Sequence, residues 1–205
     1  MKHWTPRYIC NRSLNLLSVH VLHPDWPWLT PAAVKLLRLW LKPTDDVFEW
    51  GSGRSTLWMA PRIHSITSVE SRHEWFNKVQ STAERKDLRN VKLILSSPGP
   101  NSEGAEAYVS LIAQANRCFD LILIDGCFRE LCALAAPEHL KPGGFLLIDN
   151  INWYLPSNTV APASRRPQDG PLLPEWADFM ETVKNWRQIW TSNGVWDTAI
   201  WVKPC

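Results

Sequence analysis

The sequence predicts an open α/β sheet, doubly wound with helices on both faces, in a single domain. Three observations predict it. Apolar runs of strand length alternate with segments of helical periodicity, a glycine pair follows the first of these runs, and acidic residues close four of them. A chain of 205 residues is also long enough to bury a full hydrophobic core.

The first predicted helix begins at Thr30 and Pro31. A hydroxyl at the N-cap and a proline in the first turn both favour a helix start, and apolar residues follow at helical spacing up to residue 41. Lys42 and Pro43 end this helix. The preceding residues, 1–30, are expected to be irregular.

The remaining elements are predicted in alternation. Strands are expected at 46–50, 65–70, 91–96, 119–126 and 145–149, and helices at 55–62, 73–85, 105–116 and 129–140. The fourth strand, FDLILIDG, is apolar up to its aspartate, which suits a central parallel strand buried on both faces. A loop over 151–174, a helix at 175–186 and two strands at 187–191 and 198–202 follow.

The stretch from Asp45 to Ala60, DDVFEWGSGRSTLWMA, is the centre of the predicted fold. Its apolar run ends at Glu49, the glycines Gly51 and Gly53 follow, and helical periodicity resumes after them, which predicts a strand, a sharp turn and a helix N-terminus. Glycines let a backbone approach a ligand closely, and a helix start offers free N–H groups. Such turns also occur where nothing binds.

Acidic residues stand at the expected carboxyl ends of four strands: Glu49, Glu70, Asp125 and Asp149. In open α/β sheets, ligands bind beyond these ends, because the loops there leave a crevice where the strand order reverses. Packing alone does not explain acids at four neighbouring strand ends. The sequence therefore predicts a ligand site at this edge of the sheet.

Composition narrows the classes of function. A net charge of +2 argues neither for nor against a polyanionic partner, and no stretch has the roughly 20 apolar residues that span a bilayer. Five cysteines without a CxxC pair predict neither a disulfide framework nor a zinc site, so a cytoplasmic location is expected. Four of the thirteen tryptophans lie in or beside proline-rich segments, where they either pack loops or wall a pocket: Trp26, Trp28, Trp153 and Trp176.

About half of the chain, from Glu49 to Asn150, resembles the class I S-adenosylmethionine-dependent methyltransferases. The pattern ExGxGxS is similar to their first motif, although Ser55 stands where a third glycine is usual. Glu70, 21 residues after Glu49, matches the acid that ends their second strand, and FDLILIDG and LKPGGFLLIDN resemble their fourth and fifth strand signatures. The segments PWLTPAA, FEWGSGRST and DNINWYLP resemble a bacterial branch of this class whose substrate the resemblance does not supply.

The resemblance implies a seven-stranded Rossmann-like sheet, mostly parallel with an antiparallel last strand. It also implies methyl transfer to a small-molecule acceptor, with oxygen as the expected attacking atom. Residues 44–205 would form the cofactor-binding domain, with 151–174 as a lid over the acceptor. Residues 1–43 would form an N-terminal segment and helix that border the active site. No membrane partner and no nucleic acid is expected, and the oligomeric state is left open, with a homodimer as one option.

The cofactor would contact eight residues. Glu70 would accept two hydrogen bonds from the ribose diol, a charge-assisted arrangement. Gly51 and Gly53 would admit the methionine tail, and Glu49 would face its ammonium group. Helix N–H groups near Ser55 and Thr56 would suit its carboxylate. Ser52 at the turn completes the set together with Asp125, and the adenine would lie beyond the third and fourth strands, near Ser96, Ser97 and Asp125.

Asp125, Asp149 and Asn150 resemble the Mg²⁺ ligands of the catechol-type O-methyltransferases. Hard oxygen ligands suit this ion, which would lower the pKa of an acceptor hydroxyl. However, Phe128 stands where a lysine is usual, and the nearest cation is Arg129. Two readings stay open: a Mg²⁺-dependent reaction, or a metal-free one with Asp125 as the base. Neighbouring segments hold further candidates, His20, His23 and Tyr154 as bases, and Arg165 and Arg166 as anion-binding groups.

Two other functions fit the same turn. GSGRST followed by an acid 19 residues after Gly51 fits a loose dinucleotide pattern, which would make the protein an NAD(P)-dependent oxidoreductase. The missing third glycine and the like charge of Glu49 argue against a pyrophosphate there. A non-catalytic nucleoside-binding module on the same fold is the third option, because a fold alone does not fix function.

Overall fold

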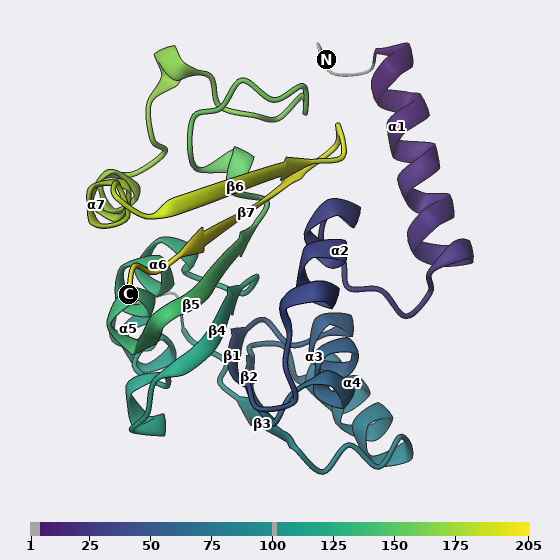
Figure 1. Cartoon of the computed structure of the whole chain (residues 1–205), viewed down its shortest axis with the longest axis vertical. Coiled ribbons are helices and arrows are strands. Elements are labelled where there is room, and N and C mark those ends of the chain that lie inside the picture. The colour runs from purple at the N-terminus through teal and green to yellow at the C-terminus, as the bar shows by residue number, and fades with distance from the viewer. Residues whose placement is uncertain (1–4, 100–101) are drawn as a thin grey trace.

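The computed structural model describes residues 5–99 and 102–205. Within them, one seven-stranded sheet has the order β3-β2-β1-β4-β5-β7-β6 (Figure 1). The strands are β1 (Asp46–Trp50), β2 (Ser65–Glu70), β3 (Val91–Leu95), β4 (Phe119–Ile124), β5 (Leu140–Asp149), β6 (Arg187–Ser192) and β7 (Asp197–Val202). The first five are parallel, and β7 runs antiparallel to both β5 and β6. The predicted fold class is confirmed.

Helices cover both faces of the sheet (Figure 1). One face packs against α2 (Pro31–Trp40) and α3 (Arg54–Met59), beside which lies α4 (His73–Arg85). The other face packs against α5 (Ser102–Val109), α6 (Arg129–Ala135) and α7 (Pro174–Thr182). The strand order reverses between β1 and β4, so the edge above these two strands is where a ligand crevice is expected.

The alternation of side chains along β1 decides which residues reach each layer. Phe48 and Trp50 belong to the core on the α5–α7 side, whereas Val47 belongs to the core under α2 and α3. Successive side chains of a strand point to opposite faces, so Glu49 shares the face of Val47. The buried acid of this strand, Glu49, therefore lies under α3.

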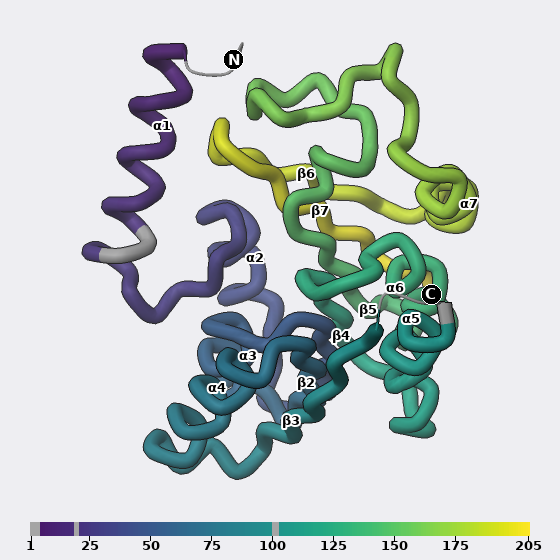
Figure 2. The backbone as a smooth tube through the Cα atoms, turned by 180° about the vertical axis from the view of Figure 1, so that it is seen from behind, coloured from purple at the N-terminus to yellow at the C-terminus, as the bar shows by residue number. Residues whose placement is uncertain are grey.

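The N-terminal region differs from the expectation. Residues 6–22, predicted as irregular, form α1 (Pro6–Leu17) and a π-helical turn η1 (Ser18–Leu22). Thr5 caps α1 by accepting a hydrogen bond from the backbone N–H of Tyr8 at 3.2 Å, with Pro6 in the first turn. Both views show α1 standing beside the body rather than inside it (Figures 1 and 2). Its apolar side chains stay largely exposed, so it lacks the periodic buried stripe that predicts helices.

Several predicted helices end earlier than expected. Those predicted at 55–62 and 129–140 become 3₁₀-helices in their last turn, as η2 (Ala60–Arg62) and η4 (Ala136–His139), each containing a proline that cannot donate to the preceding turn. The helix predicted at 105–116 is α5, starting earlier, followed by η3 (Ala113–Ala115), and that predicted at 175–186 is α7. In addition, β5 begins at Leu140, five residues before the predicted start. No helix within 5–99 and 102–205 is long and apolar enough to cross a membrane.

Candidate functional site

A cavity of about 470 Å³ opens at the carboxyl ends of β1, β2 and β4, where the strand order reverses. We call it the central cavity. It is lined by residues 51–55, 70–72 and 125–127, together with Trp28 and Trp75. The three segments are the loops that leave those strands. Six of the eight predicted cofactor residues are therefore brought together here: Gly51, Ser52, Gly53, Ser55, Glu70 and Asp125.

Gly51 is required by the packing of the turn itself. It has a φ of +98°, and an added Cβ would lie 2.6 Å from the carbonyl carbon of Asp125 and 2.7 Å from the backbone nitrogen of Gly126. A side chain here would collide with the β4 loop rather than with a ligand. Gly53 differs, since an added Cβ would lie in ordinary contact, 3.5 Å from Nε1 of Trp75. The two glycines therefore have different roles.

Glu49 lies beneath the turn and does not line the cavity. Its carboxylate accepts hydrogen bonds from the hydroxyls of Ser55 and Thr56, and from Ser68 Oγ at 2.6 Å. Burial raises the pKa of Glu49 to about 7, because the three hydroxyls only partly replace the lost solvation. The Glu49 carboxylate fixes the turn from below, and its contact with a ligand ammonium group stays a prediction.

Thr56 shares this buried position and also does not line the cavity. Its Oγ1 accepts a hydrogen bond from the backbone N–H of Gly53 at 2.9 Å while donating to Glu49. Thr56 thus caps α3 and ties the helix to β1. Its side chain shapes the turn, and a contact between the helix N–H groups near Thr56 and a ligand carboxylate stays a prediction.

Glu70 ends β2 at the wall of the central cavity, and its carboxylate is held in one orientation. One oxygen accepts hydrogen bonds from the backbone N–H groups of Ser71 at 2.9 Å and Arg72 at 2.8 Å. The other accepts one from Ser52 Oγ at 3.1 Å. Each carboxylate oxygen can accept about two hydrogen bonds, so a ligand hydroxyl can still bind. The result is a preorganised acceptor at the cavity wall.

An aromatic wall closes the cavity opposite the strand ends. Trp75 of α4 donates its indole N–H to the carbonyl oxygen of Ser52 at 2.6 Å, and its ring lies 6.2 Å from that of Trp28. Arg54 lies over the Trp28 ring, 5.3 Å from its centroid. Sequence reasoning had missed Trp75, Arg54 and Arg72 as lining residues. Their positions directly after the two motif strands were the available signal.

Arg129 occupies the place where a metal was considered. Its guanidinium donates to Asp125 Oδ1 at 2.8 Å, to the carbonyl oxygen of Asp149 at 2.7 Å and to Asn150 Oδ1 at 3.2 Å. Two further bonds reach the carbonyl oxygens of Gly126 and Asp125, so all five of its N–H groups are used. The side-chain oxygens of Asp125 and Asn150 are thus bound to a cation of the chain itself, and these residues do not fit a Mg²⁺ ion.

The pKa values of the two carboxyl groups near Arg129, those of Asp125 and Asp149, are both raised. Desolvation raises the pKa of Asp125, against the opposing effect of Arg129. Desolvation and the nearby charge of Asp125 raise the pKa of Asp149 well above its ordinary value. Asp149 also accepts a hydrogen bond from Thr198 Oγ1 at 2.5 Å. No cluster of three or more acidic, histidine or cysteine side chains suited to a metal occurs in the described parts of the chain.

A smaller cavity of about 350 Å³ adjoins the central one, with Trp28 and Asp125 lining both. We call it the adjacent cavity. Asp149 and Asn150 at the end of β5, Trp196 from the turn before β7, and Asn15 and Leu16 from α1 complete its lining. Two regions far apart in sequence therefore meet over the carboxyl end of β5.

Comparison with solved structures shows which known fold this is. A methyltransferase-like protein from Silicibacter pomeroyi is 20% identical, with a TM-score of 0.62 over 88% of this chain and 89% of that chain. A candidate methyltransferase from Streptococcus mutans, in complex with SAH, is 12% identical, with a TM-score of 0.59 over 87% and 99%. An rRNA methylase from Streptococcus thermophilus is 10% identical, with a TM-score of 0.59 over 83% and 94%.

The chain has the class I methyltransferase fold. Its sequence matches no protein-family model and no curated protein. At these identities the likeness establishes the fold, and the chemistry has to be argued from the site.

Within this methyltransferase fold, residues 151–174 pack as a loop tied to β7. The segment contains η5 (Ile151–Trp153) and η6 (Pro167–Asp169). Asn152 Oδ1 accepts a hydrogen bond from the backbone N–H of Asp197 at 3.0 Å, and Thr159 donates to the carboxylate of the same residue. Arg165 and Arg166 donate to carbonyl oxygens inside the segment. These arginines hold the loop together.

The remaining predicted residues lie around the site. Tyr154 stacks on Trp176 with ring centroids 4.9 Å apart, and His23 stacks on Trp26 at 3.9 Å. The side chain of His20 lies outside the described residues. Ser97 donates to the carbonyl oxygen of Ser71 at 2.7 Å, which fixes the loop after β3 next to the central cavity without lining it.

Proposed function

We propose that the protein is an S-adenosylmethionine-dependent methyltransferase whose cofactor binds in the central cavity. The observation that carries the proposal is the preorganised carboxylate of Glu70, which stands beside the Gly51–Gly53 turn where the strand order reverses. One hydroxyl of a ribose diol can donate to the acceptor position that this carboxylate has left, and such a charge-assisted hydrogen bond is selective. The backbone of the Gly51–Gly53 turn would lie within reach of the rest of the ligand.

The cavity residues divide the binding of this cofactor among them. Glu70 would hold the ribose, and the turn of Gly51, Ser52 and Gly53 would lie along the methionine part. Trp28 and Trp75 would exclude water from one side. When bound, the cofactor supplies a methyl group carried on a positively charged sulfur. This sulfur is a good leaving group. The chain has to align an acceptor with that methyl group, and alignment alone contributes a large share of such rate enhancements.

The adjacent cavity is the proposed acceptor site. Its volume of about 350 Å³ suits a small molecule, and it meets the central cavity at Trp28 and Asp125. Trp196 lines this cavity, and its buried indole N–H has no hydrogen-bond acceptor within the described residues, so a turn of the ring toward the cavity would let it donate to an acceptor oxygen. We assign methyl transfer to oxygen. Asp125 would take the proton from the attacking hydroxyl, while the hydrogen bond from Arg129 holds the Asp125 carboxylate in place.

The small-molecule assignment is separate from the methyltransferase assignment. One structural neighbour is an rRNA methylase, so the fold accommodates acceptors far larger than the adjacent cavity. The lining by Asn15, Leu16 and Trp28 supports the proposal that residues 1–43 border the acceptor. Residues 151–174 are proposed as a cover over it, although no residue of this segment is among the described residues that line the cavity.

The structure weakens one of the two sequence arguments against dinucleotide binding, the competing function. Because Glu49 is buried under the turn and does not line the central cavity, the argument from its like charge against a pyrophosphate is weaker. A calorimetric titration with S-adenosylhomocysteine and with NADH separates the two. We expect saturable binding of S-adenosylhomocysteine only. Binding of NADH alone would replace the proposal, and binding without methyl transfer to any small hydroxyl acceptor would favour a non-catalytic module.

A further inference from the structure

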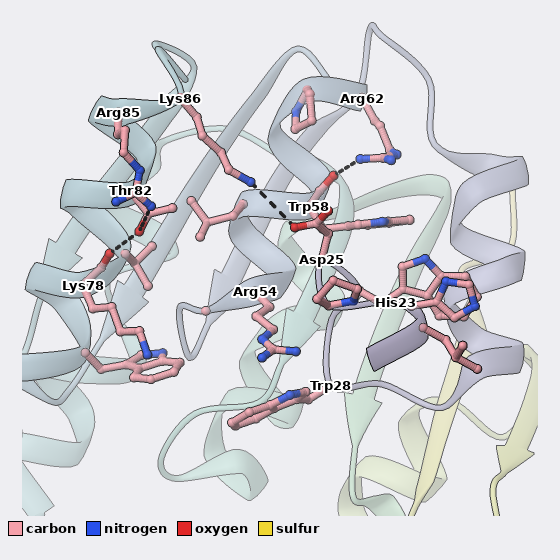
Figure 3. A pocket seen from close by; sticks show the side chains of 18 residues that line it. His23, Asp25, Trp28, Arg54, Trp58, Arg62, Lys78, Thr82, Arg85 and Lys86 are labelled. Atoms are coloured by element: carbon pink, nitrogen blue, oxygen red, sulfur yellow. Dashed lines mark hydrogen bonds and ion pairs between the residues drawn. The ribbon is translucent and has the colours of Figure 1, made fainter. Parts of the chain in front are cut away.

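A third cavity, of about 850 Å³, lies between α3, α4 and residues 22–28 (Figure 3). We call it the basic cavity. It meets the central cavity at Gly53, Arg54, Trp28 and Trp75, and extends from there along α4 toward Lys86. The proposed methyltransferase function makes no use of this space. Its size is in the range of small-ligand sites.

The charged side chains around the basic cavity are mostly positive. Among the described residues that line it, five side chains are cationic and one is acidic, Asp25. Lys78 and Thr82 of α4 and Lys86 at its C-cap stand four residues apart, so their side chains follow one face of the helix. Figure 3 shows Lys78 and Arg85 on this wall, with Arg62 on the opposite side and Arg54 over Trp28 between them.

Among the described residues that line the cavity, Asp25 is the one acid that faces the cations of α4 and η2. Asp25 pairs with Lys86 only at 4.0 Å, and the Asp25 side chain is 83% exposed. Exposed ion pairs of this kind contribute little to the stability of a protein. The pKa of Arg62 is lowered by desolvation and by the neighbouring charge of Arg38. A bound anion would relieve this repulsion.

The same cavity is walled by aromatic rings. Arg62 lies 4.3 Å from the ring centroid of Trp58, and Lys78 lies 4.6 Å from that of Trp75. At the mouth, the rings of His23 and Trp26 stack in parallel, 8° apart in plane. Cations set beside flat apolar faces are what a ligand with both a phosphate and a planar ring requires.

We propose that the basic cavity binds a nucleotide, with its phosphate among the cations of α4 and η2 and its base against the tryptophan wall. An anion without a ring would leave the indole faces unused, and a ring without an anion would leave the cations unbalanced. The nucleotide can be free or part of a single strand, since both present the same chemistry. This inference concerns binding only and does not rest on methyl transfer.

The test compares three ligands that separate ring from phosphate. Uridine monophosphate carries both, ribose 5-phosphate lacks the base, and uridine lacks the phosphate. A uracil base also avoids competition with an adenine site in the central cavity. We expect uridine monophosphate to bind at least tenfold more tightly than either fragment in calorimetry. Ribose 5-phosphate binding as tightly would overturn the nucleotide assignment in favour of a plain anion site.

Variants then locate the binding. The triple change Arg62→Gln, Lys78→Gln and Lys86→Gln should weaken uridine monophosphate at least tenfold. The matched control Arg7→Gln, Lys184→Gln and Arg187→Gln removes the same charge from exposed positions elsewhere and should change affinity less than twofold. Equal losses in the two triples would overturn the proposal. Circular dichroism melting checks that all variants fold.

Two further measurements complete the test. Trp26→Leu should weaken uridine monophosphate about tenfold, the range for one stacked base, and leave ribose 5-phosphate unchanged. Glu70→Ala, which removes the cofactor carboxylate, should leave uridine monophosphate unchanged, and loss in this variant would place the nucleotide in the central cavity instead. A fluorescent RNA hexamer identifies the source. Tighter binding with a slope of about −0.7 per phosphate contact against log salt indicates a single strand, and binding of the mononucleotide alone indicates a free nucleotide.

Discussion

Ser52 Oγ donates a hydrogen bond to Glu70 at 3.1 Å, which joins the turn after β1 to the end of β2. The carboxylate is therefore oriented by groups from two loops before any ligand arrives. Backbone N–H groups of Ser71 and Arg72 hold its other oxygen. A group fixed in this way loses little conformational entropy on binding, which favours affinity.

The two glycines of the turn should respond differently to the same substitution. Gly51→Ala places a Cβ 2.6 Å from the carbonyl carbon of Asp125 in a backbone with φ +98°. We expect a loss of at least about 2 kcal/mol in the free energy of unfolding, since strain and collision add. Gly53→Ala should lose less than about 1 kcal/mol, because its Cβ meets only ordinary contacts. Urea denaturation measures both, and equal losses would contradict the packing role of Gly51.

Glu49 should make stability depend on pH. Its pKa is raised from 4.5 to about 7 in the folded protein, so the folded state holds more protons than the unfolded state between these values. The free energy of unfolding therefore falls as pH rises through this window, by about 3 kcal/mol for a shift of this size. Asp125 and Asp149, with raised pKa values, act in the same direction.

A variant isolates the contribution of Glu49. In Glu49→Gln the titrating proton is gone, so its stability relative to the wild type should improve from pH 4.5 to 7.5. The exposed Glu84→Gln serves as control and should show a constant difference. Denaturation curves at four pH values test this. A constant difference for Glu49→Gln as well would mean that Glu49 titrates normally.

Arg129 should be needed for stability and should make added metal unnecessary. Arg129→Met leaves the carboxyl groups of Asp125 and Asp149 without their cation, and breaking such a buried pair costs about 3–5 kcal/mol. Its side chain is 13% exposed and that of Asp125 30%, so partial solvation should place the loss at the lower end. The exposed Arg89→Met is the control.

The metal question has a separate measurement. Because Arg129 binds the side-chain oxygens that a Mg²⁺ ion would use, we expect methyl transfer to survive exhaustive chelation. Activity that is lost on chelation and restored by Mg²⁺, but not in Asp149→Ala, would show that Arg129 moves aside for an ion.

Hydrogen exchange tests the proposed cover. Residues 151–174 are anchored through Asn152 and Thr159 to Asp197, so exchange should be slow near these anchors. Beyond Thr159, residues 160–164 should become more protected when cofactor and acceptor bind together. Exchange that is unchanged along the whole segment would identify it as a fixed surface connection.

The sequence predicted the sheet well because its signals are local. The ends of β1, β2 and α4 were predicted to the residue, and for the two strands the signal is a glycine directly after Trp50 and an acid at Glu70. The α1 helix was missed because its apolar side chains are exposed, so burial leaves no periodic pattern. Its capping residues, Thr5 and Pro6, were the usable signal.

The site was predicted in part, for a different reason. Period-two alternation along β1 already places Glu49 on the face of Val47, under α3. The sequence could not show that hydroxyls from α3 and β2 converge on it. Likewise, the five hydrogen bonds of Arg129 reach two strand-end segments, after β4 and at the end of β5, that only the folded sheet brings together. Tertiary geometry decides these roles.

The most direct test of the proposed function is the affinity of Glu70→Ala for S-adenosylhomocysteine. Losing hydrogen bonds to a charged group should reduce the binding free energy by about 1.5–3 kcal/mol, which makes the dissociation constant about 10- to 150-fold larger. The matched control Glu74→Ala removes an exposed acid from the first turn of α4 and should bind as the wild type does. Calorimetry at constant salt gives both values. Wild-type affinity in Glu70→Ala, with the variant fully folded, would contradict the assignment of the central cavity.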